Sequence, residues 1–217
     1  GVTRYAYDAN HRMLSITDPR NIMFITNEYD AAGRVVRQTQ ADGGVWAFAY
    51  TAVGNTVTEA RLTDPRGNAT TTRFNGQGYV TQQIDALGQV TRFERAPQTN
   101  FLLSTSDPLV RTTRFAYDAL GNVTSITDPA GNVRAFAYET TFNRAASVTD
   151  PLGQVTRFEH DVLGNVIAVV DPLGNRTTLA YNSFGQPTST TDPLGNMRTF
   201  AYDNVGNLIA VTDPVGN

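Results

Sequence analysis

YDALGNVTSITDPAGN, residues 117–132, contains two four-residue turn sequences separated by one short strand. In the second turn Asp128 stands first, Pro129 brings a fixed φ to the second position, and Gly131 at the fourth adopts left-handed backbone with little strain. A type I turn followed by a left-handed residue connects antiparallel strands, often with a bulge. The stretch therefore predicts a short strand that reverses direction at both of its ends.

The same turn recurs along the chain with a period of 21 residues. Its first position holds Asp18, Gln40, Asp64, Asp85, Asp107, Asp128, Asp150, Asp171, Asp192 and Asp213. Within one period, 118–121 and 128–131 form two turns and 122–127 and 132–138 form two strands, which leaves no room for a helix. Repeats of this length stack, and each buries apolar surface only against its neighbours.

These observations predict one repeat array of about ten units over residues 1–217, more degenerate in 1–106 and regular in 107–217. At about 4.8 Å per strand, twenty strands make a ribbon about 95 Å wide. Open sheets rarely exceed about ten strands without curling. One closed turn would be roughly 30 Å across, which is more than side chains can fill. We therefore expect an all-β, curved or spiralling antiparallel ribbon around a lumen.

The fourth position of each turn, here called the left-handed slot, tests this alignment. Gly occupies it in most copies, but Thr99 and Phe142 fall there in two of the turns that follow the ladder site described below. Both turns contain one extra residue, so we expect Asn100 and Asn143 to take the left-handed conformation instead. Val110 has no extra residue beside it, and we expect the turn around it to be of another type.

The strands that precede these turns end in two aromatic residues, as in TRFAYD (113–118) and RAFAYE (134–139). Residues two apart share one face of a strand. The second aromatic position of each strand predicts an aromatic ladder across neighbouring strands. Each contact between ladder neighbours adds about 0.2–1 kcal/mol to stability. This ladder site holds Tyr7, Tyr29, Tyr50, Phe74, Arg95, Tyr117, Tyr138, His160, Tyr181 and Tyr202.

Other segments depart from this pattern in two ways. NVIAVV (165–170) and NLIAVT (207–212) carry apolar residues at both odd and even positions, so we expect both faces of these strands to be buried. The 14-residue interval from Tyr50 to Asp64 is three residues longer than usual. We expect residues 51–63 to bulge outward and to exchange amide hydrogens faster than 160–210.

Composition excludes several classes of partner. With 17% charged residues and a net charge of −3, the chain has no field that would attract nucleic acid. It contains no Cys, so disulfides do not hold the fold. No apolar run approaches the roughly 20 residues of a membrane span, and GVTRYAYD at the N-terminus has no signal-peptide core.

The residues give little indication of chemistry. His11 lies in a left-handed slot and His160 in the ladder, so we interpret both as structural. No G-x-S-x-G sequence is present. Each turn offers a single carboxylate, too few for a Ca²⁺ loop, and its Asp is expected to bind its own turn backbone. The prediction is a non-enzymatic protein with no catalytic, cofactor-binding or metal-binding residue and no cofactor.

Two segments, YDALGNVTSITDPAGNVRAFAY (117–138) and YDNVGNLIAVTDPVGN (202–217), resemble the YD-repeat or Rhs-repeat family. They share its Tyr-Asp pair, Gly, Pro-x-Gly turn and aromatic-x-Tyr. The family often has Arg after the first Gly; here only Arg34 matches, and Asn usually replaces it. The family includes bacterial Rhs polymorphic toxins, the BC components of insecticidal toxin complexes and the teneurin shell.

The resemblance implies a β-ribbon that spirals into a hollow shell around a C-terminal toxin or effector before delivery. Its expected partners are the remaining repeats of the shell and the enclosed polypeptide, within a larger bacterial protein that is secreted or delivered. Both ends of the chain fall in turns without a capping unit, so we expect a fragment. The family's core ends in a DPxGL self-cleavage motif, but Asn217 stands where Leu is expected, so we do not transfer that site.

A second hypothesis is an adhesive repeat module that binds glycans or a cell-surface receptor. Sugar stacking would need exposed rings, so the ladder residues decide between the two. If the rings are buried between strands, substitution of Tyr117 and Tyr202 by Ala should lower stability without affecting sugar binding.

Overall fold

The computed structural model describes residues 1–216. Over that range the chain forms twenty strands and no helix, so no described helix could cross a membrane. The all-β prediction is confirmed, because the strands pair antiparallel with their neighbours in chain order, as β12 does with β13. The chain divides into two compact units, residues 1–112 and 113–217.

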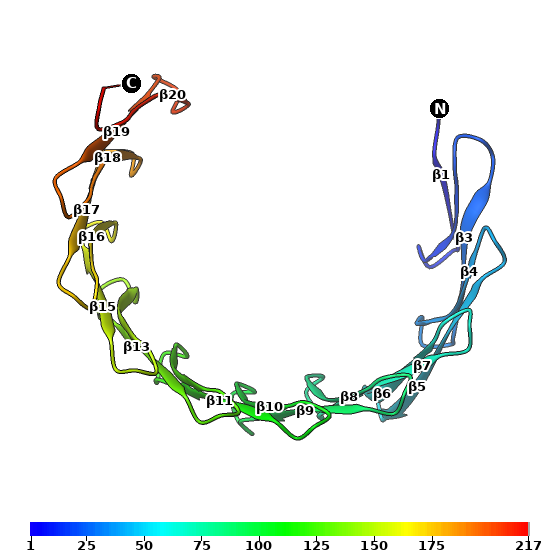
Figure 1. Cartoon of the computed structure of the whole chain (residues 1–217). Helices are drawn as coiled ribbons and strands as arrows, with labels where there is room; N and C mark the ends of the chain where they lie inside the picture. Colours follow the sequence, from blue (N-terminus) through cyan, green and yellow to red (C-terminus); the bar gives the residue numbers. More distant parts are fainter. Residues whose placement is uncertain (217) are drawn as a thin grey trace. The chain divides into compact units, whose positions relative to one another are not determined.

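The first unit holds ten strands that follow one another along the chain: β1 (Arg4–Tyr7), β2 (Met13–Thr17), β3 (Met23–Tyr29), β4 (Val35–Gln40), β5 (Val45–Val53), β6 (Thr56–Thr63), β7 (Ala69–Phe74), β8 (Val80–Ile84), β9 (Val90–Arg95) and β10 (Leu102–Ser106). The second unit holds β11 (Thr112–Tyr117), whose first residue still belongs to the first unit, β12 (Val123–Thr127), β13 (Val133–Tyr138), β14 (Ala145–Thr149), β15 (Val155–His160), β16 (Val166–Val170), β17 (Arg176–Tyr181), β18 (Pro187–Thr191), β19 (Met197–Tyr202) and β20 (Leu208–Thr212). Within each unit the strands lie side by side in a ribbon one layer thick (Figure 1).

Turns alternate between the two edges of each ribbon, because every strand runs opposite to the one before. Turns such as 128–131 define the Asp-Pro edge, and turns such as 118–121, which follow the ladder site, define the Tyr edge. A β-bulge shifts the register by one residue at or near the end of strands that enter the Tyr edge, as between Ala116 and Tyr117. β2 has a comparable shift at the Asp-Pro edge, between Ile16 and Thr17.

The left-handed slots confirm most of the predicted geometry. Asn100 and Asn143 both have a φ of 57°, as the extra residue in their turns predicts. The prediction for Val110 is wrong: its φ is 63°, and its N–H donates to the Asp107 carbonyl at 2.9 Å as in the other turns. The turn backbone and the Asp107 side chain fix this conformation against an unfavourable left-handed energy of about 1–2 kcal/mol for Val.

Strand boundaries differ from the prediction by one residue. β12 and β13 begin at Val123 and Val133, because Asn122 and Asn132 complete the preceding turns. The interval 51–63 does not loop outward as expected. Its extra residues lengthen β5 and β6, which stay paired up to Val53 and Thr56 with one register shift between Thr51 and Ala52, so fast exchange is no longer expected there.

A single layer leaves almost no buried core. Among the described residues Ala168 in β16, at 0% exposure, is the buried hydrophobic one. The prediction that 207–212 is buried on both faces is wrong, since Leu208 is 52% and Ile209 64% exposed. Among the described strands β20 pairs with β19 alone, whereas β16 lies between β15 and β17.

The two faces of the second unit differ in chemistry. On one face Phe or Leu lies directly opposite Ile, Val or Thr on the next strand. The pairs are Phe115–Ile126, Phe136–Val148, Phe158–Val169, Leu179–Thr190 and Phe200–Val211. We call this the apolar face. The other face carries mainly small and polar side chains, among them the ion pair between Arg176 and Glu159. The separation has exceptions, since Arg134 and Arg198 lie on the apolar face opposite Ile126 and Thr190.

Candidate functional site

A carboxylate stands at the start of most turns of the chain. The Asp128 carbonyl accepts from the Gly131 N–H at 3.0 Å, and its own N–H donates to the Asn132 carbonyl at 3.0 Å. Its Oδ1 accepts the N–H groups of Ala130 (2.8 Å) and Asn132 (2.9 Å), and its Oδ2 accepts from Asn132 Nδ2 at 2.8 Å. The predicted bonding of Asp to its own turn is confirmed.

These bonds favour the ionised carboxylate. The side-chain amide of Asn132, with the backbone N–H groups, holds the pKa of Asp128 below its usual value of 3.8. Corresponding bonds lower the pKa of Asp118, Asp171 and Asp192. Within residues 1–216 no three His, Cys, Asp or Glu side chains are placed to hold a metal ion.

The residue directly after the left-handed slot, here called the exit residue, bridges to the next repeat on the Tyr edge. Arg34 donates from Nε to Asp30 Oδ2 at 2.7 Å, and its guanidinium lies 4.7 Å from the centre of the Tyr50 ring. Asn122 replaces Arg in the bond to Asp118 and exchanges two amide hydrogen bonds with Asn143. The family's Arg and this chain's Asn therefore occupy equivalent positions.

The ladder tyrosines use their hydroxyl groups to bind the backbone. Tyr138 OH donates to the Val123 carbonyl at 2.9 Å, and Tyr181 and Tyr202 bind Val166 and Pro187 in the same way at 2.8 and 2.9 Å. Each bond joins the end of one strand to the start of the preceding strand. These rings are half-buried, so ring and hydroxyl are both engaged in the fold.

The two histidines lie where the sequence places them. His11 has a φ of 60° in its left-handed slot, and His160 ends β15 in the ladder. They lie in different units. Asp213 starts a turn closed by the Gly216 N–H at 3.0 Å, whereas Asn217, on which the cleavage argument depends, lies outside the described residues.

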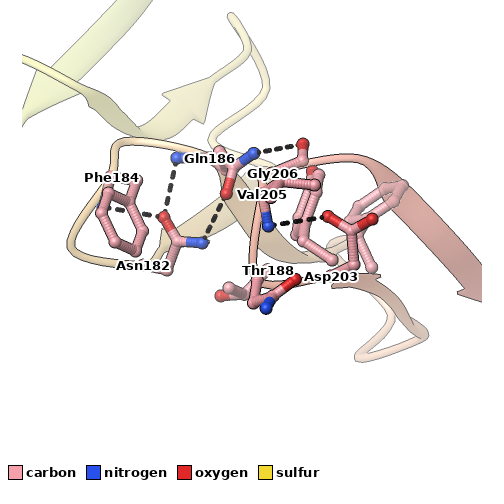
Figure 2. Close-up of a pocket in the computed structure, with 10 residues that line it drawn as sticks. Asn182, Phe184, Gln186, Thr188, Asp203, Val205 and Gly206 are labelled. Carbon is pink, nitrogen blue, oxygen red and sulfur yellow. Dashed lines mark hydrogen bonds between the residues drawn. The ribbon is translucent and has the colours of Figure 1, made fainter.

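A hollow forms between two successive turns of the Tyr edge, at 182–186 and 203–206 (Figure 2). Phe184, Phe200, Tyr202 and Val205 supply apolar lining. Its polar groups are bonded to one another: Asn182 Nδ2 donates to Gln186 Oε1 at 2.9 Å, and Gln186 Nε2 donates to the Gly206 carbonyl at 2.8 Å. Such a lining suits an apolar group better than a polar ligand.

A similar hollow lies two repeats earlier, lined by Phe142, Phe158 and His160. These hollows and the exit-residue bridges were not predicted from the sequence. Both features are formed by residues about twenty positions apart in the sequence. The recurrence of one residue type at the same position of successive repeats was the sequence feature that could have indicated them.

The model of the RHS repeat family matches residues 29–61, 99–133, 141–176, 160–197 and 181–217. Together these ranges cover more than half of the chain. No curated protein matches the sequence.

Several solved structures share the fold. A TcdB2–TccC3–TEV crystal structure superposes with a TM-score of 0.68 at 17% identity, over 97% of this chain and 14% of the other. A TcdB2–TccC3 crystal structure gives 0.65 at 16% identity over the same shares. A Tc holotoxin pore from Photorhabdus luminescens gives 0.56 at 15% identity, over 98% of this chain and 17% of the other. This chain thus spans about one seventh of the first two chains.

Proposed function

The chain belongs to the RHS repeat family, and from that membership we propose that it forms part of the wall of a hollow shell. The shell encloses and protects a toxin or effector polypeptide before delivery. The partners of this segment are the remaining repeats of the shell and the enclosed polypeptide. The whole protein is bacterial and is secreted or delivered from the cell.

The observation that carries this proposal is the one-layer ribbon with chemically different faces. A globular domain covers its apolar side with a second layer of secondary structure. Here Phe136 and Phe158 stay half-buried on the apolar face of a single layer. A ribbon of this kind is suited to separating two environments, as a wall does.

The side-chain chemistry supports a non-enzymatic role. The turn carboxylates accept hydrogen bonds from their own turns, as Asp128 does at three N–H groups. His11 and His160 lie in different units and each occupies a repeat position with a structural use. We therefore assign the segment no catalytic step and no cofactor.

The ladder geometry favours the container over the adhesive module. Glycan stacking needs exposed aromatic faces, but Tyr138, Tyr181 and Tyr202 are half-buried and bind backbone carbonyls. The rings on which the adhesive hypothesis depends are thus part of the repeat's own structure.

The proposal is tested on the native parent protein, isolated with an antibody against this array. Intact mass and C-terminal sequencing should identify a chain several times larger with an unrelated tail. Limited proteolysis should leave that tail uncut until the protein is denatured. A parent of about the size of this segment that binds glycans would instead favour the adhesive module.

A matched pair of variants tests the wall itself. Phe158→Asp places a charge on the apolar face and should make the tail sensitive to protease. Arg157→Asp, one residue earlier and on the polar face, should leave the tail protected. Equal sensitivity of the tail in both variants and the wild type would overturn the proposal.

A further inference from the structure

One junction between successive repeats on the Tyr edge has its two residue types exchanged. In the usual form the exit residue is a cation and the next ladder residue is a ring, as where the Arg34 guanidinium lies 4.7 Å from the centre of the Tyr50 ring. Further along the first unit the exit residue is Tyr79 and the next ladder residue is Arg95. The Arg95 guanidinium lies 5.4 Å from the centre of the Tyr79 ring. The contact is kept although cation and ring have changed places.

The exchanged ladder residue also keeps the backbone bond of the ladder. Arg95 Nε donates to the Val80 carbonyl at 2.8 Å, and Val80 directly follows the exit residue. Tyr50 OH donates to the corresponding Val35 carbonyl at 2.9 Å. Arg95 Nη1 adds a bond to the Asn100 carbonyl at 3.0 Å. The guanidinium can replace the phenol because both groups are planar and donate hydrogen bonds.

A third residue differs together with these two. Asp30 starts the turn that ends at Arg34 and accepts from its Nε at 2.7 Å. The exchanged junction has no cation at the exit position, and its turn starts with Asn75. Asn75 Oδ1 accepts two backbone N–H groups of its turn as an Asp does, while its Nδ2 donates to Asn100 Oδ1 at 2.7 Å. The carboxylate is thus missing where the guanidinium that it would bind is missing.

The sequence shows the same restriction at the other junctions. Arg occupies the exit position in three turns, and the next ladder residue is then a ring; the pairs are Arg12–Tyr29, Arg34–Tyr50 and Arg144–His160. Arg95 is the one Arg among the ladder residues, and the exit residue before it is Tyr79. A cation is attracted to a ring face, whereas neighbouring like charges repel. No junction of the chain combines Arg with Arg.

We propose that the exit residue and the next ladder residue form one matched pair that decides which repeats can lie side by side. A repeat with an exit Arg accepts a neighbour whose ladder residue is a ring. A repeat with an exit ring accepts a neighbour whose ladder residue is Arg. Specificity needs an unfavourable combination as well as a favourable one, and Arg beside Arg supplies it. This inference does not depend on any enclosed polypeptide.

Exchanging the two side chains in the 217-residue chain tests the pair, with hydrogen exchange of the β8 and β9 amides as the measurement. Tyr79→Arg brings two guanidinium groups together and should lower protection about tenfold. Arg95→Tyr removes the cation and the bond to the Asn100 carbonyl, and should lower protection about threefold. Independent effects would multiply to about thirtyfold in the double variant, whereas a matched pair should return protection to within about threefold of the wild type.

A control with the same composition and charge combines Tyr79→Arg with Arg92→Tyr. Residue 92 lies on the opposite face of β9 from residue 95, so this control should keep the tenfold loss. A thirtyfold loss in the exchanged variant, or an equal recovery in the control, would overturn the proposal. Circular dichroism checks that every variant keeps the strand content of the wild type.

Asn75→Asp tests the third residue in two backgrounds. In the wild type it removes the donor to Asn100 Oδ1 and should lower protection. In the variant with both exchanges it gives the new exit Arg the partner that Arg34 has in Asp30, and should raise protection about threefold. An effect of the same sign in both backgrounds would contradict the matching of the junction.

Discussion

Hydroxyl groups of the ladder tyrosines satisfy backbone carbonyls next to the bulges of the Tyr edge. Tyr138 binds the Val123 carbonyl at 2.9 Å and is half-buried, whereas Tyr7 is 56% exposed. Among residues 1–216 the Tyr7 hydroxyl has no hydrogen-bond partner. The same residue type at the same site of the repeat thus has different energetic roles in different copies.

Tyr138→Phe should lower the free energy of unfolding by about 1 kcal/mol, because one hydrogen bond is lost and one carbonyl is left to water. Urea denaturation followed by circular dichroism measures the change. Tyr7→Phe is the matched control and should have no effect. Equal losses in the two variants would mean that the hydroxyl bond is unimportant.

Val110→Gly should raise stability by about 1 kcal/mol, because Gly relieves the left-handed strain of a β-branched residue. The reverse change, Gly131→Val, puts that strain into another Asp-Pro turn, where an added Cβ meets no atom within 4 Å, and should destabilise the protein. Thermal unfolding compares the two. A loss of stability in Val110→Gly would show that the Val side chain makes a contribution larger than the strain.

The left-handed slots also show how far the sequence can predict this structure. Asn100 and Asn143 could be assigned because an extra residue changed the spacing of two turns. Val110 could not, since a turn held by Asp107 overrides the local preference of Val. The bridge from Arg34 to Tyr50 was missed because sequence spacing alone does not show which repeats touch on the Tyr edge.

At the scale of the strand pair, the carboxylates of the turns determine how the stability of the hairpins depends on pH. Asp118, Asp128, Asp171 and Asp192 have lowered pKa values in the folded protein, mainly through exit-residue and backbone hydrogen bonds. A carboxyl group whose pKa is lower in the folded than in the unfolded state stabilises the folded protein. This stabilisation is fully present at pH values above the unfolded-state pKa. That contribution is lost as the pH falls through the folded pKa.

The urea midpoint should therefore be nearly constant from about pH 7 to 5 and should fall below about pH 4. Asp128→Asn should weaken this dependence, because an amide oxygen can accept both backbone bonds without titrating. Asn182 does so at 3.0 Å from the N–H groups of both Phe184 and Gln186. A midpoint that falls already between pH 7 and 5 would contradict the assignment.

The exposure of β20 depends on its neighbouring strands and could not be predicted from its own sequence. Its sequence resembles that of β16, yet Ala168 in β16 is fully buried while Ala210, at the same position of β20, is exposed. The difference comes from the number of strands beside it, which the residues of one strand do not encode. The lengthened β5 and β6 show the same limit, since extra residues can extend a hairpin as readily as they form a bulge.

Across the whole molecule, each strand gains its contacts from the strands next to it. Arrays of this kind respond locally to substitution, because stability is close to a sum of repeat and neighbour terms. Within the described residues, no second layer of secondary structure covers the apolar face of the second unit. The destabilising effect of a substitution is therefore not passed to distant strands through such a layer.

Phe158→Ala removes the partner of Val169 and should lower local stability by about 1–3 kcal/mol, less than for a fully buried Phe. Hydrogen exchange read by mass spectrometry should show lost protection in β14 to β16 and none in β1 to β4. Arg157→Ala, on the polar face, is the control. Uniform loss across residues 1–216 would show that the chain unfolds as one cooperative body.

The lengthened turns at 96–100 and 139–143 have a consequence for how such a protein can change. One residue inserted into a strand reverses which side chains point to each face. In these two copies the additional residue lies in the turn, and a left-handed Asn restores the connection, so the following strand keeps its orientation. Residues can therefore be inserted into or deleted from the turns of the Tyr edge without moving the side chains of the next strand to the opposite face. Peptide tags inserted between Thr140 and Thr141 should be tolerated for the same reason.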